Sequence, residues 1–444
     1  MNGAMEPAGG EPEEVEGEGS GETGALRPSR RGLLGLLGAG VAGLAVGGAG
    51  GAAIAASAAG GQTAAGRSSV VPFHGEHQAG IVTPAQDRLH FAAFNMVSGS
   101  SRDDLIQLLR DWSEAAERLT QGRPLGTGLE PGDALLPPDD TGEAEGLQAG
   151  NLTLTFGLGR SLFTGSGEGG SEDPYGIRSQ LPAAFEPLPS FAFDLLEPAQ
   201  SGGDLCVQAC ADDPQVAVHA IRNLARIAVG RTHLAWSQLG FGRTASTSRR
   251  QDTPRNLFGF KDGTMNVMSD ETEALAEHVW VGDEAPAWLR GGSYIVTRKI
   301  LMTIEAWDRA SLAEQERTFG RTKLAGAPLT GGGEFDHPDF AAERDGAPVI
   351  DMAAHVRLAH PDQNGGTRIL RRGYNYVDGS NELGQLGAGL FFISFQRDPA
   401  AFVRLQRSLK HDLLGEYIRH ISSGLWAVPG GVRRGEFVGQ RLFD

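Results

Sequence analysis

The sequence predicts an α+β fold in which two ferredoxin-like halves form a barrel of the dimeric α+β type. At 444 residues the chain is longer than one ordinary domain, and its 40% hydrophobic content is enough for a substantial core. Period-two strands and amphipathic helices follow one another in a similar order in both parts of the chain. A polar, arginine-rich connection near 246–255 separates the parts, so we place the N-terminal half at 70–250 and the C-terminal half at 251–444.

The N-terminal half has clear strand and helix patterns. Residues 101–119 carry apolar side chains at helical spacing behind a capping serine, which predicts an amphipathic helix. Residues 151–159 ("NLTLTFGLG") alternate with period two, as a half-buried strand does. A second helix is expected over 214–230, where proline occupies a favoured first position. Further strands are expected at 87–97 and 204–211, and a Gly/Pro/Asp-rich loop at 121–151.

The C-terminal half repeats these patterns. Residues 292–304 ("GSYIVTRKILMTI") alternate as a strand, and residues 387–399 contain an apolar run typical of a core strand. Helices are expected over 306–320 and 399–409. The similarity between the halves lies in the order of elements, because no strong internal sequence repeat is present.

Charge and cysteine content narrow the function. A formal net charge of -16 argues against nucleic acid or an anionic membrane surface as the main partner. Seven glutamates fall in the first 26 residues, so the body is only moderately acidic. If "LCVQAC" is a strand, Cys206 and Cys210 lie roughly 13 Å apart, beyond the ~7 Å limit for a disulfide. We therefore expect two packed thiols.

Residues 1–59 predict an acidic leader followed by a twin-arginine signal peptide. Arg30 and Arg31 open a Gly/Ala-rich apolar run that ends in small residues near Ala55. Because the run exceeds about 18 residues, a membrane anchor is the alternative, but bulky apolar side chains are few. We expect export by the twin-arginine route to the periplasm or the extracellular space, with no stable membrane span after processing.

The segment "NLFGFKDGTMN" is the sharpest local feature. Gly259 and Gly263 flank Phe260-Lys261-Asp262, which indicates a tight backbone excursion that presents one carboxylate at a fixed place. Asp-Gly also marks ordinary turns, so the pattern alone leaves a structural turn as the alternative.

Two further segments carry residues suited to chemistry. In "AAHVRLAHP", His355 and Arg357 lie two residues apart, on one face of a strand or adjacent in a loop. Most single histidines are not ligands, so this pattern by itself assigns no role. In "RILRRGYNYVDG", Arg371 and Arg372 follow an apolar pair, and an inward-pointing arginine needs a carboxylate or an anionic ligand.

In this order the segments resemble the dye-decolourising peroxidase family over almost the whole chain after residue 70. The family's G-x-x-D-G signature is matched by Gly259, Asp262 and Gly263. The stretches "PFHGEHQAGIVTPAQDRLHFAAF", "FGRTKLAGAPL" and "HISSGLWAVPGG" resemble its exported, iron-uptake-associated (deferrochelatase/peroxidase) branch. Each stretch alone is weak evidence for the family, but the whole set in this order is specific to it.

The resemblance implies a haem bound in the C-terminal half with His355 as the iron ligand. Asp262 is then expected to exchange a proton with hydrogen peroxide as a general acid–base. Arg371 is expected to stabilise the charge that develops as the O–O bond breaks, with Arg372 as the alternative.

The resemblance also implies the other haem contacts. The sequence has no C-x-x-C-H motif, so we expect one non-covalent haem b per chain. Asp412 is the candidate to orient the iron ligand, and Arg357 to pair with a haem propionate. The residues expected around the haem are His355, Arg357, Gly259, Phe260, Lys261, Gly263, Thr264, Asn266, Leu390, Phe392 and Asp412.

The implied function is a haem peroxidase that reduces hydrogen peroxide and oxidises organic donors such as dyes and phenols. The alternative is a haem-binding protein that releases iron from haem for uptake. Beyond peroxide and organic electron donors, the expected partners are iron-uptake components and a second copy of the chain, with no nucleic acid.

Overall fold

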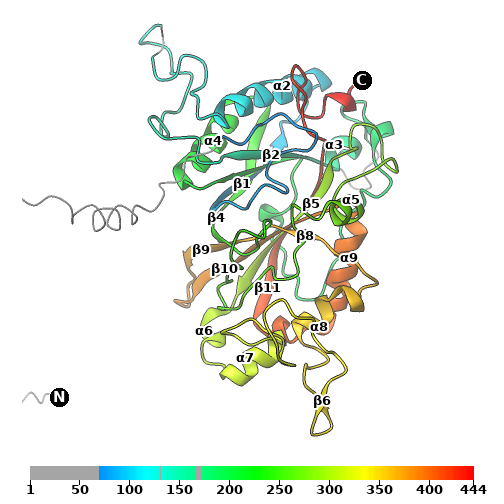
Figure 1. The fold of residues 1–444 in the computed structure, drawn as a ribbon. Helices are drawn as coiled ribbons and strands as arrows, with labels where there is room; N and C mark the ends of the chain where they lie inside the picture. The colour runs from blue at the N-terminus through cyan, green and yellow to red at the C-terminus, as the bar shows by residue number, and fades with distance from the viewer. Residues whose placement is uncertain (1–69, 131, 166–171) are drawn as a thin grey trace, which may run out of the picture. The chain divides into compact units, whose positions relative to one another are not determined.

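The computed structural model describes residues 70–130, 132–165 and 172–444, so the predicted leader and signal peptide lie outside the described residues. Figure 1 shows the elements with the labels used below. The helices and strands of the first half are β1 (Arg88–Met96), α2 (Arg102–Leu119), β2 (Thr153–Gly159), α3 (Ser161–Thr164), β3 (Leu205–Ala211), α4 (Pro214–Ile227) and β4 (Thr232–Arg243).

The first half has the β-α-β-β-α-β order of a ferredoxin-like unit. Its strands lie in the order β2-β3-β1-β4, and each neighbouring pair is antiparallel. Helices α2 and α4 pack together on one face of these strands (Figure 1). Ser101 and Asp104 form a capping box at the start of α2, and Asp213 caps α4 ahead of its proline.

The second half repeats this arrangement. Its four main strands lie in the order β11-β5-β10-β9, again antiparallel, and the short strand β8 pairs with β10 beside β9. The elements are α5 (Thr272–His278), β5 (Ser293–Met302), α6 (Ile304–Trp307), α7 (Leu312–Phe319), β6 (Glu343–Arg344), β7 (Ala347–Pro348), α8 (His355–Ala359), β8 (Leu370–Arg371), β9 (Tyr374–Ser380), β10 (Leu386–Gln396), α9 (Pro399–Ser408) and β11 (Ile418–Val428).

The two four-stranded units close into one barrel. Strand β11 pairs with β2, strand β4 pairs with β9, and the β5–β10 pairing completes the ring. The predicted α+β barrel of two ferredoxin-like halves is confirmed. Closure removes the exposed edges that four-stranded sheets would otherwise present.

Aromatic side chains fill the inside of the barrel. The ring of Phe91 lies 5.4 to 5.5 Å from the rings of Trp236, Phe391 and Trp426, which come from β4, β10 and β11. The predicted packed thiols, Cys206 and Cys210, are free and buried in the same cluster. The strands therefore turn one face inward and leave the other face to the helices and loops.

Three local predictions differ from the structure. The helix expected over 306–320 is broken, because α6 ends at Trp307 and Ser311 caps a separate α7. The segment 353–361, expected as a strand or loop, forms the helix α8, which follows a turn at Asp351. Strands β4 and β11 had no counterpart among the expected elements.

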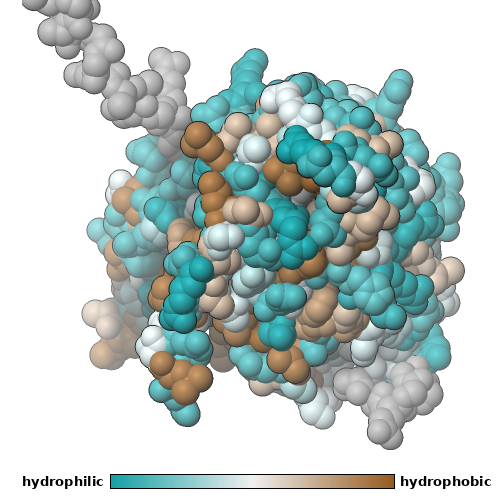
Figure 2. Space-filling model, turned by 90° about the horizontal axis from the view of Figure 1, so that it is seen from below, coloured by the Kyte–Doolittle hydropathy of each residue, from teal (hydrophilic) through white to brown (hydrophobic). Residues whose placement is uncertain are grey.

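No helix among the described residues is long and apolar enough to cross a lipid bilayer. The face shown in Figure 2 is mostly hydrophilic, and its hydrophobic residues gather in separate smaller patches. The largest fully buried side chains, by contrast, are mostly aromatic.

We expect Trp426→Ala to lower the free energy of unfolding by about 3–5 kcal/mol, because it empties the barrel where β11 meets β2. It also removes the indole N–H that donates to Gly203 O at 2.9 Å. Chemical denaturation followed by circular dichroism measures the change. Leu383→Ala, at a residue 82% exposed, is the control and should shift stability by no more than about 0.5 kcal/mol. Equal effects would contradict this role of Trp426.

Candidate active site

A cavity lies against the face of the second-half strands that points away from the barrel interior. Alternate residues of β5, β10 and β11 form one wall, and α8 and α9 contribute the wall that faces it. The loop after β4 and the segment leading into β8 complete the lining. Its apolar side chains from the strands are Ile300, Met302, Leu390, Phe392 and Ile418.

Two glycines and an asparagine hold Asp262 at this cavity. Gly259 and Gly263 have φ angles of 81° and 87°, in the left-handed region where glycine carries no steric penalty. A Cβ atom at Gly263 would lie 2.9 Å from Ala245 Cα. Asn256 Nδ2 donates to Asp262 Oδ2 at 3.3 Å. The backbone excursion therefore fixes the direction of one carboxylate.

Arg371 reaches the same carboxylate from β8. Its Nη1 donates to Asp262 Oδ1 at 2.7 Å. Asn266 binds both backbone polar groups of Arg371. Its Oδ1 accepts the Arg371 N–H at 2.7 Å, and its Nδ2 donates to the Arg371 carbonyl oxygen at 2.9 Å. Arg372 is fully buried, and its guanidinium donates to groups of the N-terminal half. Of the two arginines, Arg371 lines the cavity.

His355 enters the cavity from the first turn of α8. Its Nδ1 lies 2.5 Å from Asp412 Oδ2, and Asp412 Oδ1 accepts the N–H of Leu414 at 2.9 Å. An ionised carboxylate can only accept, so Nδ1 carries a proton, and in the neutral imidazole Nε2 is the nitrogen with the free lone pair. Burial disfavours the charged imidazole, but Asp412 outweighs burial and raises the pKa of His355.

Lys261 and Thr264 line the cavity but are tied to Glu334. Lys261 Nζ forms a close ion pair with Glu334, and Thr264 Oγ1 donates to Glu334 Oε1 at 3.3 Å. Burial opposes ionisation of this carboxyl, yet Lys261, together with hydrogen bonds from Thr253 and Thr264, outweighs burial and lowers the pKa of Glu334. These contacts fasten the loop around Asp262 to the segment after α7.

Arg357, the residue expected at a propionate, is held by backbone carbonyl groups in the structure. Its Nη2 donates to Phe340 O at 2.7 Å and to Ile350 O at 2.8 Å, and its guanidinium lies over the Phe340 ring. It is not among the residues that line the cavity. Because α8 is a helix, residues two apart point in different directions, so Arg357 does not join His355 in the cavity lining.

Three more residues expected at the cofactor lie behind the cavity wall. Phe260 is 1% exposed and stacks on Phe319 at 4.1 Å, Gly259 makes the turn, and Asn266 positions Arg371. They support the site and do not line it. The other predicted residues do line it: Lys261, Asp262, Gly263, Thr264, His355, Arg371, Leu390, Phe392 and Asp412.

A buried charge cluster on the strand wall was missed from the sequence. Arg298, which is 1% exposed, forms a close ion pair with Asp194 and donates to His420 Nδ1 at 2.8 Å. Burial lowers the pKa of His420 although Asp194 opposes this shift. Arg298 and His420 both line the cavity. The available signal was an arginine on the strand face that Ile300 and Met302 share in 292–304.

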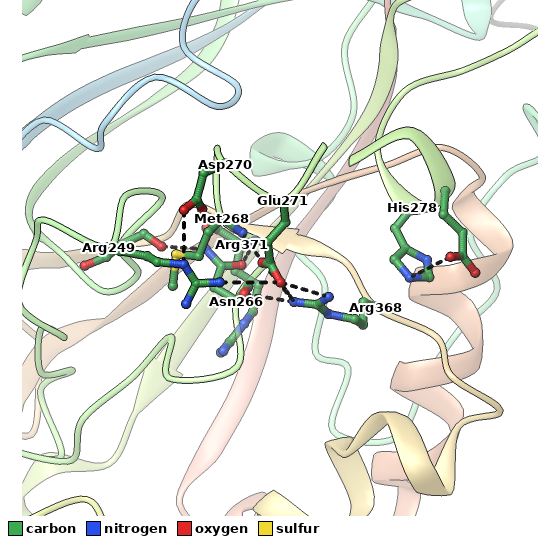
Figure 3. Close-up of polar contacts among 10 residues, drawn as sticks. Arg249, Asn266, Met268, Asp270, Glu271, His278, Arg368 and Arg371 are labelled. Atoms are coloured by element: carbon green, nitrogen blue, oxygen red, sulfur yellow. Dashed lines mark hydrogen bonds and ion pairs between the residues drawn. The ribbon is translucent and has the colours of Figure 1, made fainter. Parts of the chain in front are cut away.

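A second missed network anchors the arginines near β8. Figure 3 shows Glu271 between Arg368 and Arg249, with Arg368 Nη2 3.2 Å from Glu271 Oε2. Arg368 Nη2 also donates to Asn266 O at 3.2 Å. Asn266 and Glu271, which follow Asp262 in the sequence, therefore position both Arg368 and Arg371.

The cavity fits a haem group. Its strand wall carries five apolar side chains beside the Arg298–His420 cluster, which suits a flat porphyrin with charged substituents. His355 offers one imidazole nitrogen, and a carboxylate fixes its ring. Arg298 and Arg368 each keep a buried Nε–H without a hydrogen-bond partner among the described residues, which suits anionic substituents. With the Asp262–Arg371 ion pair on the same cavity, the fold and site define a haem protein of the peroxidase class.

Comparison with known proteins agrees with this class. The chain matches the models "Dyp-type peroxidase, C-terminal" over residues 253–433 and "Dyp-type peroxidase, N-terminal" over 78–242. It is 37% identical over 429 residues to the Deferrochelatase of Escherichia coli (strain K12), and the matched region covers 95% of this chain and 98% of that protein.

Two solved structures are similar over most of their length. The DyP-type peroxidase from Streptomyces coelicolor has a TM-score of 0.77 and 41% identity, covering 85% of this chain and 98% of that one. The oxyferrous complex of DtpA from Streptomyces lividans has a TM-score of 0.76 and 40% identity, with the same coverage of 85% and 98%. The chain belongs to the Dyp-type peroxidase family, and it is a haem peroxidase.

We expect Asn266→Ala to slow the reaction with hydrogen peroxide between about 10- and 100-fold, because Arg371 loses both backbone contacts that aim it at the cavity. Stopped-flow absorbance of the haem-loaded protein measures the rate. The matched control is Asn223→Ala, a fully buried asparagine of α4 in the other half, which should lower stability and leave the rate unchanged. A normal rate in Asn266→Ala would contradict the positioning role.

Proposed function

We propose that the cavity holds one non-covalent haem b per chain, with His355 Nε2 as the iron ligand. The main support is the His355–Asp412 hydrogen bond of 2.5 Å, which leaves Nε2 as the free donor atom. Both cysteines of the chain lie in β3 inside the barrel, so neither is available for covalent attachment at the cavity. Arg298 and Arg368 are our candidates for the propionates, because each keeps a buried, unpartnered Nε–H there.

Haem iron, when bound, supplies the site at which hydrogen peroxide is reduced by two electrons. We assign proton transfer to Asp262, which accepts a proton from peroxide and returns it to the leaving oxygen as water forms. One carboxylate oxygen accepts a hydrogen bond from Arg371, and the other accepts one from Asn256. Each oxygen therefore keeps a further lone pair that can accept a proton.

Arg371 is assigned the electrostatic part of the reaction. Its guanidinium is always charged and is held 2.7 Å from Asp262, so it can stabilise negative charge as the O–O bond breaks without moving far. Glu271 and Asn266 hold the neighbouring backbone in place, because they accept the N–H groups of Met268 and Arg371 respectively. The electrons are then taken from organic donors such as dyes and phenols.

A second candidate function is release of iron from haem, because a relative 37% identical over 95% of this chain carries the name Deferrochelatase. Removing iron from the ring requires two protons for the pyrrole nitrogens, and the cavity offers Asp262 and His420 as titratable groups. Anaerobic incubation of haem-loaded protein with a reductant and an iron chelator tests it. Recovery of intact protoporphyrin supports this function, and recovery of unchanged haem alone refutes it.

We also propose that the full chain is exported through the twin-arginine route to the periplasm or outside the cell. The support is the sequence of residues 1–59, with Arg30 and Arg31 before the apolar run. Replacing both by lysine should retain the haem-loaded protein in the cytoplasm with its leader attached. Cell fractionation and the mass of the recovered chain measure this, and unchanged export of the double variant would refute the route.

We expect Asp262→Asn to slow the reaction with peroxide by about 10²–10⁴-fold and Arg371→Leu by about 10²–10³-fold, through loss of proton transfer and of charge stabilisation respectively. Stopped-flow absorbance at varied peroxide concentration gives both rates. Asp270→Asn, which removes an exposed carboxylate beside Arg249, is the control and should react normally. Unchanged rates in both variants would show that the roles are wrongly assigned.

His355→Gly should weaken haem binding and change the absorption spectrum, because the cavity then lacks its imidazole. Added imidazole should restore much of the original spectrum by filling the space. Haem titration of the purified protein measures both effects, and His233→Gly, at an exposed residue of β4, is the control. Normal binding and spectrum in His355→Gly would exclude it as the iron ligand.

A further inference from the structure

Two histidines and an aspartate meet at the rim of the cavity, apart from the residues assigned above. His337 Nε2 lies 3.0 Å from Asp362 Oδ2, and His360 Nδ1 lies 3.5 Å from the same oxygen. One ligand atom from each of the three residues lies within 4.8 Å of the others. His337 and Asp362 are exposed, while His360 is 4% exposed and lines the cavity.

The segment that carries His337 crosses between the two sides of the site. We call residues 334–340 the strap. At its start Glu334 binds Lys261, the neighbour of Asp262. At its end Phe340 accepts from Arg357 of α8, and its ring lies 5.1 Å from the His360 ring. The strap therefore joins the loop of Asp262 to the helix of His355.

We propose that His337, His360 and Asp362 bind a divalent transition-metal ion, separate from the haem, which fastens the strap to the end of α8. Two imidazoles and one carboxylate suit Cu²⁺ and Zn²⁺, and the Irving–Williams order makes Cu²⁺ the tighter of the two. Ligands about 2.0–2.1 Å from a tetrahedral zinc lie roughly 3.3 Å apart, close to the two separations seen here. The remaining positions are open to water.

The hydrogen bonding of His360 leaves room for a ligand. Nδ1 of His360 accepts the Asp362 N–H at 3.2 Å, a long hydrogen bond that the metal would replace. The buried Nε2 of His360 has no hydrogen-bond partner among the described residues. The contacts among the three side chains therefore leave one imidazole nitrogen without a hydrogen bond.

The competing explanation is an ordinary surface ion pair between His337 and Asp362. Such a pair between side chains that are 63% and 52% exposed contributes little to stability. It binds Cu²⁺ no better than any other exposed histidine does. Metal affinity therefore separates the two explanations.

The test is a Cu²⁺ titration of the haem-loaded protein against a competing chelator, with electron paramagnetic resonance of the bound Cu²⁺. We expect one ion per chain with coupling to two imidazole nitrogens. His337→Ala should lower the affinity at least about tenfold and remove one nitrogen from the spectrum, and Asp362→Asn should also weaken binding. His233→Ala, at an exposed histidine on β4, is the matched control and should bind as the original protein does.

Zn²⁺, which has no redox chemistry, tests the position of the site. It should slow hydrogen exchange of backbone amides in the strap and around residues 360–364 in the original protein but not in His337→Ala. Equal Cu²⁺ affinity in His337→Ala, His233→Ala and the original protein would overturn the proposal. So would Zn²⁺ binding that leaves exchange in the strap unchanged. Neither result depends on the roles given to His355 or Asp262.

Discussion

The register of strand β10 is the constraint on which both the barrel and the cavity depend. Its residues Phe391, Ile393 and Phe395 are fully buried inside the barrel, while Leu390 and Phe392 between them line the cavity. Side chains alternate between the faces of a strand, so a shift by one residue would exchange the two sets. Filling the barrel therefore also builds the apolar wall of the site.

Pairing on both sides of β10 fixes this register and carries it to the polar residues. Strand β5 pairs with β10 from Gly389 to Gln396, and a Cβ atom at Gly389 would meet Ile300 O at 1.9 Å. On the other side, Ser394 is the partner of Arg371 in β8. The arginine at the cavity is thus placed by the same strand that supplies the wall, and Asn266 locks its backbone from the loop that presents Asp262.

Much of the fold could be predicted from the sequence, where patterns are long and regular. The helix at 102–119 follows clear helical periodicity, and the strand at 386–396 contains an apolar run typical of a core strand. Strand β11 carries a histidine and serines, which weaken that pattern because one of its faces lines a cavity rather than a core. Helix α8 has five residues, too few for a helical period to be recognised.

The site was predictable only in part, because some of its residues belong to no long or regular local pattern. Asp262 and Gly263 stand in a local motif, and Asp412 was expected as the partner of His355 only after the resemblance had made that histidine an iron ligand. The direction of Arg357 could not, since it depends on whether the segment is strand or helix. The Arg298–Asp194–His420 cluster joins residues more than 100 positions apart, which no local pattern records.

The polar groups of the cavity are arranged so that few charges stand alone. Lys261 pairs with Glu334, Arg368 with Glu271 and Arg371 with Asp262. Removing one member of a partly buried pair leaves the other charge poorly solvated, so these residues hold each other in place. The carboxylate of Asp262 has two donors, Arg371 at 2.7 Å and Asn256 at 3.3 Å. Glu334 instead accepts from Lys261, Thr253 and Thr264. Glu271 accepts from the Met268 N–H and from two nitrogens of Arg368. The acceptor positions that remain on Asp262 are the ones that the proposed mechanism uses, while Glu334 and Glu271 hold the surrounding loops together.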